Sequence, residues 1–230
     1  MNIAVIPARG GSKRIPRKNI RGFAGKPMIS YAIDTALASG MFDHVVVSSD
    51  DQEIIDIART CGAEAPFLRP ATLADDYTPT VPVITHAVNA CIEIGWKIDH
   101  VCCIYPSVPF IEIEDLLRAF SLLVGSDAAF SFPVTEFPAA IQRALRRLPN
   151  GRMEPFQPEY ENTRTQDLET SYHDAGQFYW GSAHSWKENH RIHSSGVGLP
   201  IPNWRVVDID SHEDWVRAEL LFKTYKQARY

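Results

Sequence analysis

Residues 3–20 read IAVIPARGGSKRIPRKNI and form the most specific segment of the chain. Its first part, residues 3–7, is a short apolar run that predicts a buried strand. A basic loop containing Gly10 and Gly11 follows at once. Glycines let backbone N–H groups turn toward an anion, and lysine and arginine side chains add charge-assisted hydrogen bonds to phosphate oxygens. The stretch therefore predicts a phosphate-binding loop at the carboxyl end of a strand, where open α/β sheets bind ligands.

Charge is distributed unevenly along the chain. The first 33 residues hold seven basic residues and no acidic one, so with a formal net charge of −5 overall the remainder carries −12. The basic segment lacks interleaved aromatic residues, and an acidic body would repel a polyanion. A small, dense anion such as a triphosphate is therefore the predicted partner, and nucleic acid is not. The loop contains neither GxxxxGK[ST] nor GxGxxG, which disfavours a P-loop ATPase and a dehydrogenase.

The rest of the chain alternates short β-branched runs with amphipathic stretches, which is typical of a parallel sheet covered by helices on both faces. We expect an α/β protein in three α/β/α layers. The expected strands are residues 3–7, 44–48, 100–105, 128–133, 177–180, 196–201 and 206–208. The expected helices are residues 27–38, 52–61, 79–94, 112–124 and 212–225. Their expected caps are Gly40, Asp50 or Asp51, Thr78, and the pair of Ser211 and Asp214.

We expect a single domain over residues 1–230. From 135 to 169 the periodicity breaks into Pro-rich and polar sequence, so residues 135–175 are interpreted as an arm or insertion. No apolar run approaches the roughly 20 residues that span a bilayer, and the first residues lack the basic flank of a signal peptide. A cytoplasmic protein with no membrane partner is the expectation.

The cysteines and histidines predict no metal site. Cys61, Cys91, Cys102 and Cys103 form no CxxC pair, so buried reduced thiols are expected. The spacing of His184, His190 and His193 fits no standard site. The segment around Trp186 is interpreted as an exposed helix, and Trp180, Trp204 and Trp215 as packing or arm anchors.

A pair of acidic residues lies near the end of the chain, in Val206-Val207-Asp208-Ile209-Asp210. On a strand, Asp208 and Asp210 would lie on one side with Ile209 turned into the core. Two clustered carboxylates favour a hard cation, and magnesium takes one or two of them together with phosphate oxygens and water. The same pattern is also typical of two acidic residues without a metal, at the end of a strand that precedes a capped helix.

The amino-acid sequence of the opening loop resembles that of the cytidylyltransferases of acidic nine-carbon sugars, the CMP-nonulosonate family. The resemblance extends over almost the whole chain. The resemblance implies that Arg9, Ser12 and Lys13 contact the triphosphate of CTP, with Lys18 in support. Ala8, Gly10, Gly11 and Asn19 of the same loop are assigned to nucleotide binding with them. Two later segments resemble the family's nucleotide-side strand and loop, and they contribute Arg69, Thr78 and Thr80.

The resemblance also assigns the catalytic centre. Asp208 and Asp210 match the metal-binding DID of the family, which makes Mg²⁺ the expected cofactor. The catalytic group is then Arg9, Lys13, Lys18, Asp208 and Asp210. In the implied reaction the anomeric hydroxyl of the sugar attacks the α-phosphorus of CTP and pyrophosphate leaves. The base could be a metal-bound water, Asp208 or Asp210.

A donor pocket for the acidic sugar is expected near the arm, because arginine can bind a carboxylate with two hydrogen bonds. The candidates for sugar binding are Tyr105, Gln142, Arg143, Arg164, Gln166, Asp174, Gln177 and Tyr179. The sequences of residues 141–145, 164–169 and 173–180 resemble those of the pseudaminic acid branch more than those of the N-acetylneuraminic acid branch. Tyr105 and Ala175 stand where the latter has glutamine and asparagine. The family implies a homodimer through the arm, so Arg143, Arg164 or Gln166 could act across the interface.

Other functions remain open from the sequence. Within the enzyme class the alternatives are CMP-N-acetylneuraminate synthesis, transfer to the related eight-carbon acid, and sugar-1-phosphate nucleotidyl transfer. From another class, a non-catalytic nucleotide-binding module could keep the fold. A binder has no need of an acidic pair opposite a triphosphate loop, and pyrophosphate release would separate the two classes.

Overall fold

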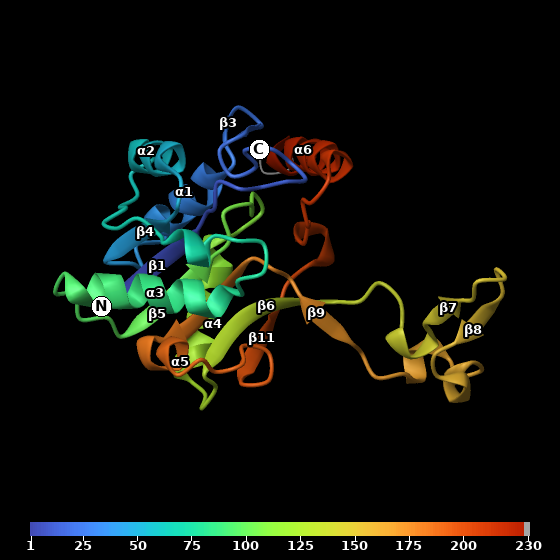
Figure 1. The fold of residues 1–230 in the computed structure, drawn as a ribbon. Helices are drawn as coiled ribbons and strands as arrows, with labels where there is room; N and C mark the ends of the chain where they lie inside the picture. The colour runs from blue at the N-terminus through green and yellow to red at the C-terminus, as the bar shows by residue number, and fades with distance from the viewer. Residues whose placement is uncertain (228–230) are drawn as a thin grey trace.

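The chain folds around one mixed β-sheet, seen in a computed structural model that describes residues 1–227 (Figure 1). Residues 228–230, the end of the predicted domain, lie outside the described residues. Within the described residues the sheet has seven strands, in the order β11-β6-β10-β5-β1-β4 with β9 paired to β6. The strands are β1 Asn2–Pro7, β4 His44–Ser48, β5 His100–Ile104, β6 Phe130–Glu136, β9 Tyr172–Asp174, β10 Phe178–Ser182 and β11 Gly196–Pro200.

The sheet is mostly parallel, as predicted. β1 pairs in parallel with β4 and β5, and β11 pairs in parallel with β6. β10 runs antiparallel between β5 and β6, and β9 runs antiparallel to β6. Because β1, β4 and β5 point the same way, their carboxyl ends meet at one edge of the sheet, which is the edge where this type of sheet binds ligands.

Helices cover both faces of the sheet and confirm the predicted three α/β/α layers. One face carries α1 Ile29–Ser39, α2 Gln52–Thr60 and α4 Ile113–Val124, and the other carries α3 Thr80–Glu93 and α5 Ala183–Lys187. Along β1, Ala4 and Ile6 pack on the first face while Ile3 and Val5 pack on the second. This burial on both faces explains why residues 3–7 are continuously apolar.

The last helix, α6 His212–Gln227, packs against a hairpin of β2 Gly22–Phe23 and β3 Lys26–Pro27 near the chain start (Figure 1). Phe23 meets Trp215 and Phe222 of α6 in edge-to-face ring contacts with centroids 5.4 and 5.5 Å apart. Ile209 belongs to the same apolar cluster. The cluster therefore ties the segment before α6 to the loop after β1.

Three of the predicted helix caps are confirmed. Gly40 ends α1 with φ of 63°, a conformation that glycine adopts without steric cost. Asp51 begins α2, since its side chain accepts the N–H of Ile54 at 3.2 Å. Ser211 and Asp214 exchange hydrogen bonds at the start of α6, with the Asp214 N–H donating to Ser211 Oγ and the Ser211 N–H donating to Asp214 Oδ2.

Three local predictions are wrong. Residues 206–208 form no strand, because a 3₁₀ turn, η5 Asn203–Arg205, precedes them and they run on as irregular chain. Thr78 does not cap α3, which begins at Thr80 after Pro79. Of the segment predicted as an exposed helix, residues 187–189 are exposed, but Trp186 is not: its indole is fully buried and donates to the carbonyl of Val101 at 3.2 Å.

Residues 137–171 leave the sheet between β6 and β9 and project from the body as an arm (Figure 1). The ends of the predicted 135–175 segment belong to the sheet, since β6 continues to Glu136 and β9 begins at Tyr172. The arm holds the ribbon β7 Leu145–Arg147 and β8 Met153–Pro155, and the 3₁₀ turns η2 Ile141–Arg143, η3 Pro158–Tyr160 and η4 Thr165–Asp167.

The cysteines are free thiols, and Cys91, Cys102 and Cys103 are buried as predicted. Among residues 1–227, no helix is both long and apolar enough to cross a membrane.

Candidate functional site

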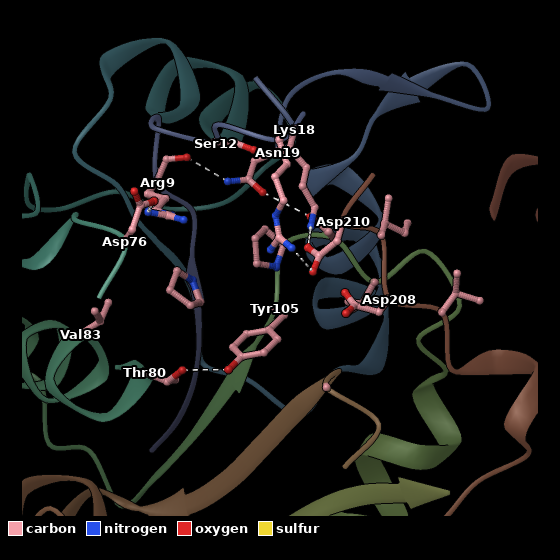
Figure 2. A pocket seen from close by; sticks show the side chains of 18 of the residues that line it. Arg9, Ser12, Lys18, Asn19, Asp76, Thr80, Val83, Tyr105, Asp208 and Asp210 are labelled. Carbon is pink, nitrogen blue, oxygen red and sulfur yellow. Dashed lines mark hydrogen bonds and ion pairs between the residues drawn. The ribbon is translucent and has the colours of Figure 1, made fainter. Parts of the chain in front are cut away.

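A cleft of about 1,140 Å³ opens at the carboxyl ends of β1 and β5 (Figure 2). It brings together residues from the loop after β1, the start of α3, the end of β5, the turn after β9 and the segment before α6. The predicted site residues that line it are Arg9, Ser12, Lys13, Lys18, Asn19, Arg69, Thr78, Thr80, Tyr105, Asp174, Asp208 and Asp210. Residues separated by some 200 positions in the sequence thus share one cavity.

Hydrogen bonds to its backbone fix the conformation of the loop after β1. The buried Asn19 donates from Nδ2 to the Arg9 carbonyl at 3.0 Å and accepts from Ser107 Oγ at 3.3 Å. The Gly10 N–H donates to Asp50 Oδ1 at 3.1 Å. A Cβ on Gly10 would lie 2.5 Å from Asp51 Oδ2, so this position accepts glycine alone. Asn19 and Gly10 therefore shape the loop.

The remaining backbone positions of the loop lie at its edge. Ala8 is fully buried and Gly11 is exposed, and neither residue is among those that line the cleft. Their assignment to nucleotide binding, like that of Gly10, rests on backbone groups and stays a prediction.

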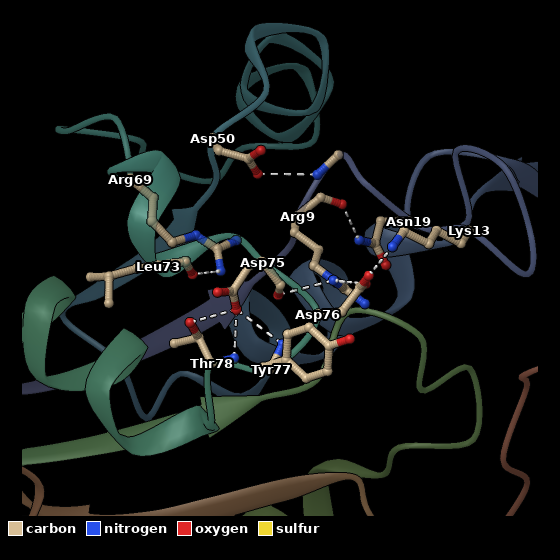
Figure 3. Close-up of polar contacts among 11 residues, drawn as sticks. Arg9, Lys13, Asn19, Asp50, Arg69, Leu73, Asp75, Asp76, Tyr77 and Thr78 are labelled. Atoms are coloured by element: carbon tan, nitrogen blue, oxygen red, sulfur yellow. Dashed lines mark hydrogen bonds and ion pairs between the residues drawn. The ribbon is translucent and has the colours of Figure 1, made fainter.

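Four cations of the loop form two pairs, and each pair faces one carboxylate in the cleft. Arg9 and Lys13 both pair with Asp76, and the Lys13 Nζ to Asp76 Oδ2 distance is 2.5 Å (Figure 3). Arg14 and Lys18 both pair with Asp210, at 2.8 and 3.6 Å. The hydrogen bonds from Lys13 and Arg9 hold the pKa of the Asp76 carboxyl below its usual range.

Asp208 and Asp210 line the cleft opposite the start of α3 (Figure 2). Although they lie on irregular chain, the predicted alternation holds, because Ile209 between them is buried in the cluster with Trp215. Burial, and then the negative charge of Asp210, raise the pKa of Asp208, while Lys18 and Arg14 act in the opposite direction. A cation placed between the two carboxylates would relieve this repulsion.

This pair fits a magnesium ion that also needs substrate. In the described part of the chain no group of three or more His, Cys, Asp or Glu side chains could cage a metal by itself. Magnesium is commonly held by one or two carboxylates with the remaining positions taken by water and substrate phosphates. Asp208 and Asp210 supply such a set beside the basic loop.

A buried ion pair fixes the segment that carries the two carboxylates. Arg205, three residues before Asp208, binds Asp115 of α4 with both terminal nitrogens, at 2.5 and 3.3 Å. Both side chains are nearly inaccessible. Gln177 is buried as well, and its Nε2 donates to the Arg205 carbonyl at 2.9 Å. Gln177 is not among the residues that line the cleft, and it supports the segment that carries the two carboxylates; its contact with sugar stays a prediction.

The nucleotide side of the cleft contains Arg69, whose guanidinium is buried and whose pKa burial lowers. Its Nη2 donates to the Ser48 carbonyl at 2.9 Å. Thr80 and Tyr105 share a hydrogen bond of 2.8 Å between their hydroxyl groups at the start of α3. Thr78 donates from its hydroxyl to Asp75 Oδ1 at 2.7 Å, so it is bound within its own turn.

Asp174 faces the cleft from the other side. Its Oδ2 accepts the Tyr179 hydroxyl at 2.7 Å and lies 2.7 Å from His193 Nε2, and its Oδ1 accepts the Gly176 N–H at 2.8 Å. Tyr179 is buried, and burial raises the pKa of its phenol, so the hydroxyl remains a donor. Tyr179 lines a neighbouring cavity of about 530 Å³ instead of the main cleft.

Four predicted sugar-binding residues are not brought to this cleft. Gln142, Arg143, Arg164 and Gln166 lie on the arm of the same chain. There Gln142 donates to the Glu169 carbonyl at 3.0 Å, and Arg143 donates to Thr165 Oγ1 at 3.5 Å.

The lining residues that the sequence did not assign to the site include Arg14, Asp76, His173 and Arg217. Arg14 lies in the basic loop, but its neighbours Lys13 and Lys18 were assigned to the site instead. The adjacent acids Asp75 and Asp76, close after Arg69, are a signal that could have identified Asp76 as a partner of the basic loop.

Comparison with known proteins matches residues 3–193 to the cytidylyltransferase family model. The chain is 43% identical, over its full length and 99% of the relative, to a pseudaminic acid cytidylyltransferase of Campylobacter jejuni. It is 30% identical to a CMP-N,N'-diacetyllegionaminic acid synthase of Legionella pneumophila, over 98% of each chain. Among solved structures it is similar to a CMP:2-keto-3-deoxy-manno-octonic acid synthetase complexed with CTP. That likeness has a TM-score of 0.71 over 97% of this chain and 99% of the other at 16% identity, so it indicates the fold.

Proposed function

The chain belongs to the cytidylyltransferase family, and from this premise we propose that it transfers CMP from CTP to the anomeric hydroxyl of pseudaminic acid, releasing pyrophosphate. The observation that carries the proposal is the cleft itself. It places the cations of the loop after β1 next to two carboxylates, Asp208 and Asp210, 200 residues further along the chain. A triphosphate and a hard cation need this combination of charges.

The chain's own residues hold and orient the nucleotide in the proposed reaction. Arg9 and Lys13 bind phosphate oxygens by charge-assisted hydrogen bonds, and Lys18 of the same loop pairs with Asp210 at 3.6 Å. The attacking hydroxyl must be aligned with the α-phosphorus and the leaving pyrophosphate. Phosphoryl-type transfer of this kind depends on positioning and on neutralisation of charge, and needs no covalent nucleophile.

Asp208 and Asp210 would hold the Mg²⁺ ion of the reaction. When bound, the ion neutralises charge on the phosphates and polarises the phosphorus that is attacked. Burial, and after it repulsion by Asp210, raise the pKa of Asp208, which supports this assignment because a bound cation would stabilise the charged carboxylate. It also leaves Asp208 as a candidate to accept the proton of the attacking hydroxyl.

The sugar is proposed from three observations. The full-length relative at 43% identity is named for pseudaminic acid. Tyr105 lines the cleft at the position where the N-acetylneuraminic acid enzymes usually have a glutamine. Its hydroxyl forms a hydrogen bond with that of Thr80. Asp174 presents a carboxylate held by three donors, which can accept a hydrogen bond from a hydroxyl or an amide N–H of the sugar.

We expect pyrophosphate release with CTP, magnesium and pseudaminic acid, and at least tenfold lower kcat/KM with N-acetylneuraminic acid or the eight-carbon acid, about 1.4 kcal/mol of discrimination. The measurement is a coupled pyrophosphate assay with the three sugars in parallel. Turnover with N-acetylneuraminic acid alone would contradict the choice of sugar. No turnover with any of the three would favour a nucleotide-binding module.

We also propose a homodimer formed through the arm. The two-stranded ribbon β7–β8 is too small to be stable without packing, yet the arm exposes large apolar side chains. These are Phe137, Ile141, Leu145, Met153, Phe156 and Tyr160. A second copy of the chain would cover them and could bring Arg143 or Arg164 to the neighbouring cleft.

With CTP as substrate, the cytoplasm is the proposed location.

Mixed dimers test the arm. Arg164→Ala and Asp208→Asn are each expected to abolish most activity, one by losing the sugar carboxylate partner and the other by losing the metal. After subunit exchange, the mixture should regain about a quarter of wild-type activity, because half of the dimers are mixed and each carries one intact site. Arg152→Ala, on the same arm, is the matched control and should keep wild-type activity. A mixture that stays inactive would refute sharing of the site.

A further inference from the structure

We propose that Asp76 sets the affinity of the nucleotide site: its carboxylate is an internal counter-anion that competes with the phosphates of CTP and of pyrophosphate for Arg9 and Lys13. The inference rests on the proposed function, since it concerns the same triphosphate site. Asp76 was not among the residues assigned to the site from the sequence.

The geometry of Asp76 resembles that of a bound phosphate group. One carboxylate oxygen pairs with Arg9 Nη1 and the other lies 2.5 Å from Lys13 Nζ (Figure 3). Each oxygen thus engages a different cation, as two oxygens of one phosphate would. Lys13 is 81% exposed and Asp76 is 28% exposed, so a ligand entering the cleft can reach both. A phosphate can bind these cations only by replacing the carboxylate or by sharing them with it.

The turn that carries Asp76 is held independently of the ion pairs. Asp75 Oδ1 accepts the N–H groups of Tyr77 and Thr78, at 2.9 and 2.6 Å, and the Thr78 hydroxyl. That carboxylate is occupied in shaping the turn, which leaves Asp76 as the acid that faces the loop. Substitution of Asp76 should therefore remove a charge without unfolding the turn.

Arg9 has a second anchor, which decides the direction of the expected effect. Its Nη1 also donates to the Asp75 carbonyl at 3.0 Å. Without the Asp76 carboxylate, this bond still directs the guanidinium into the cleft. Loss of Asp76 should thus free both cations for phosphate while Arg9 stays directed into the cleft, and binding of polyphosphate should become tighter.

Asp76 and the proposed metal pair are separate features of the cleft. Figure 2 shows Asp76 beside Arg9, with Tyr105 between it and Asp208. Asp210 also neutralises two loop cations, but its proposed role is to bind Mg²⁺, so removing it would change two things at once. Asp76 has the cations alone as partners among the ion pairs of the described residues. Its substitution therefore isolates the counter-anion effect.

The test measures binding of inorganic pyrophosphate with magnesium by titration calorimetry, with no sugar present. Asp76→Asn and Asp76→Ser should each lower the Kd for pyrophosphate about three- to tenfold, because binding no longer has to break two solvent-exposed ion pairs. The KM for CTP should fall in the same proportion. Asp56→Asn, on α2 outside the cleft, removes the same charge from the surface and should leave the Kd unchanged.

An unchanged or higher Kd in both Asp76 variants would overturn the inference, as would the absence of pyrophosphate binding in all four proteins. An equal decrease in the Asp56 control would overturn it too, because net charge would then explain the effect. The result is separable from the proposed function. Wild-type turnover with no effect of Asp76 refutes the counter-anion alone, whereas tighter binding without turnover refutes the reaction alone.

Discussion

Asp208→Asn is expected to lower kcat for pyrophosphate release by about 10²–10³-fold, the usual cost of removing one group that stabilises charge in the transition state. The amide keeps the shape of the side chain but takes away its negative charge, so the hard cation loses one of its two carboxylates. Asp208 forms no ion pair within residues 1–227 that the substitution would break, whereas Asp210 pairs with Arg14 and Lys18.

The measurement is the rate of pyrophosphate release as a function of magnesium concentration at saturating CTP. The variant should require more magnesium for half its maximal rate, which a general loss of folding would not produce. Glu213→Gln is the matched control, since it removes an exposed acid five residues away at the start of α6. Activity within threefold of wild type and an unchanged magnesium dependence would contradict the metal assignment.

Asp115→Ala is expected to lower the free energy of unfolding by about 3–5 kcal/mol, because it leaves the Arg205 guanidinium buried without a partner. The two side chains form a bidentate pair in the interior, at 2.5 and 3.3 Å. The loss should also affect function, since Arg205 fixes the chain just before Asp208. We therefore expect a raised magnesium requirement in addition to the lower stability.

Urea unfolding, followed by tryptophan fluorescence, measures this effect. The double variant Asp115→Leu with Arg205→Met is the informative control, because replacing both members of a buried pair by apolar residues is often close to neutral. The double variant should recover much of the stability lost in the single one. If both variants unfold at the same urea concentration as wild type, the pair does not hold the segment.

Local patterns in the sequence were sufficient for the core of this protein. Continuous apolar runs such as residues 3–7 predicted strands buried on two faces, and Gly40, Asp51 and the pair of Ser211 and Asp214 marked the helix ends that the structure has. These features depend on residues close together in the chain. Periodicity, caps and turn residues act over a few positions, so they can be interpreted without knowledge of the fold.

Side chains with more than one possible partner were less predictable. Gln177 and Tyr179 were expected to meet sugar, yet Gln177 supports Arg205 and Tyr179 supports Asp174 from buried positions. The antiparallel β10 inserts between β5 and β6, and this arrangement determines which of its side chains point inward. No pattern within residues 177–180 carries that information.

Neighbouring residues were enough to predict the α/β class, the basic loop after the first strand and the acidic pair near the end of the chain. The three-dimensional fold was needed to show that the loop and the pair share one cleft, that Asp76 faces Arg9 and Lys13, and that the arm residues lie away from it. Ion pairs and cavities join residues that are far apart in the chain. Their partners are chosen by the packing of the whole sheet and its helices.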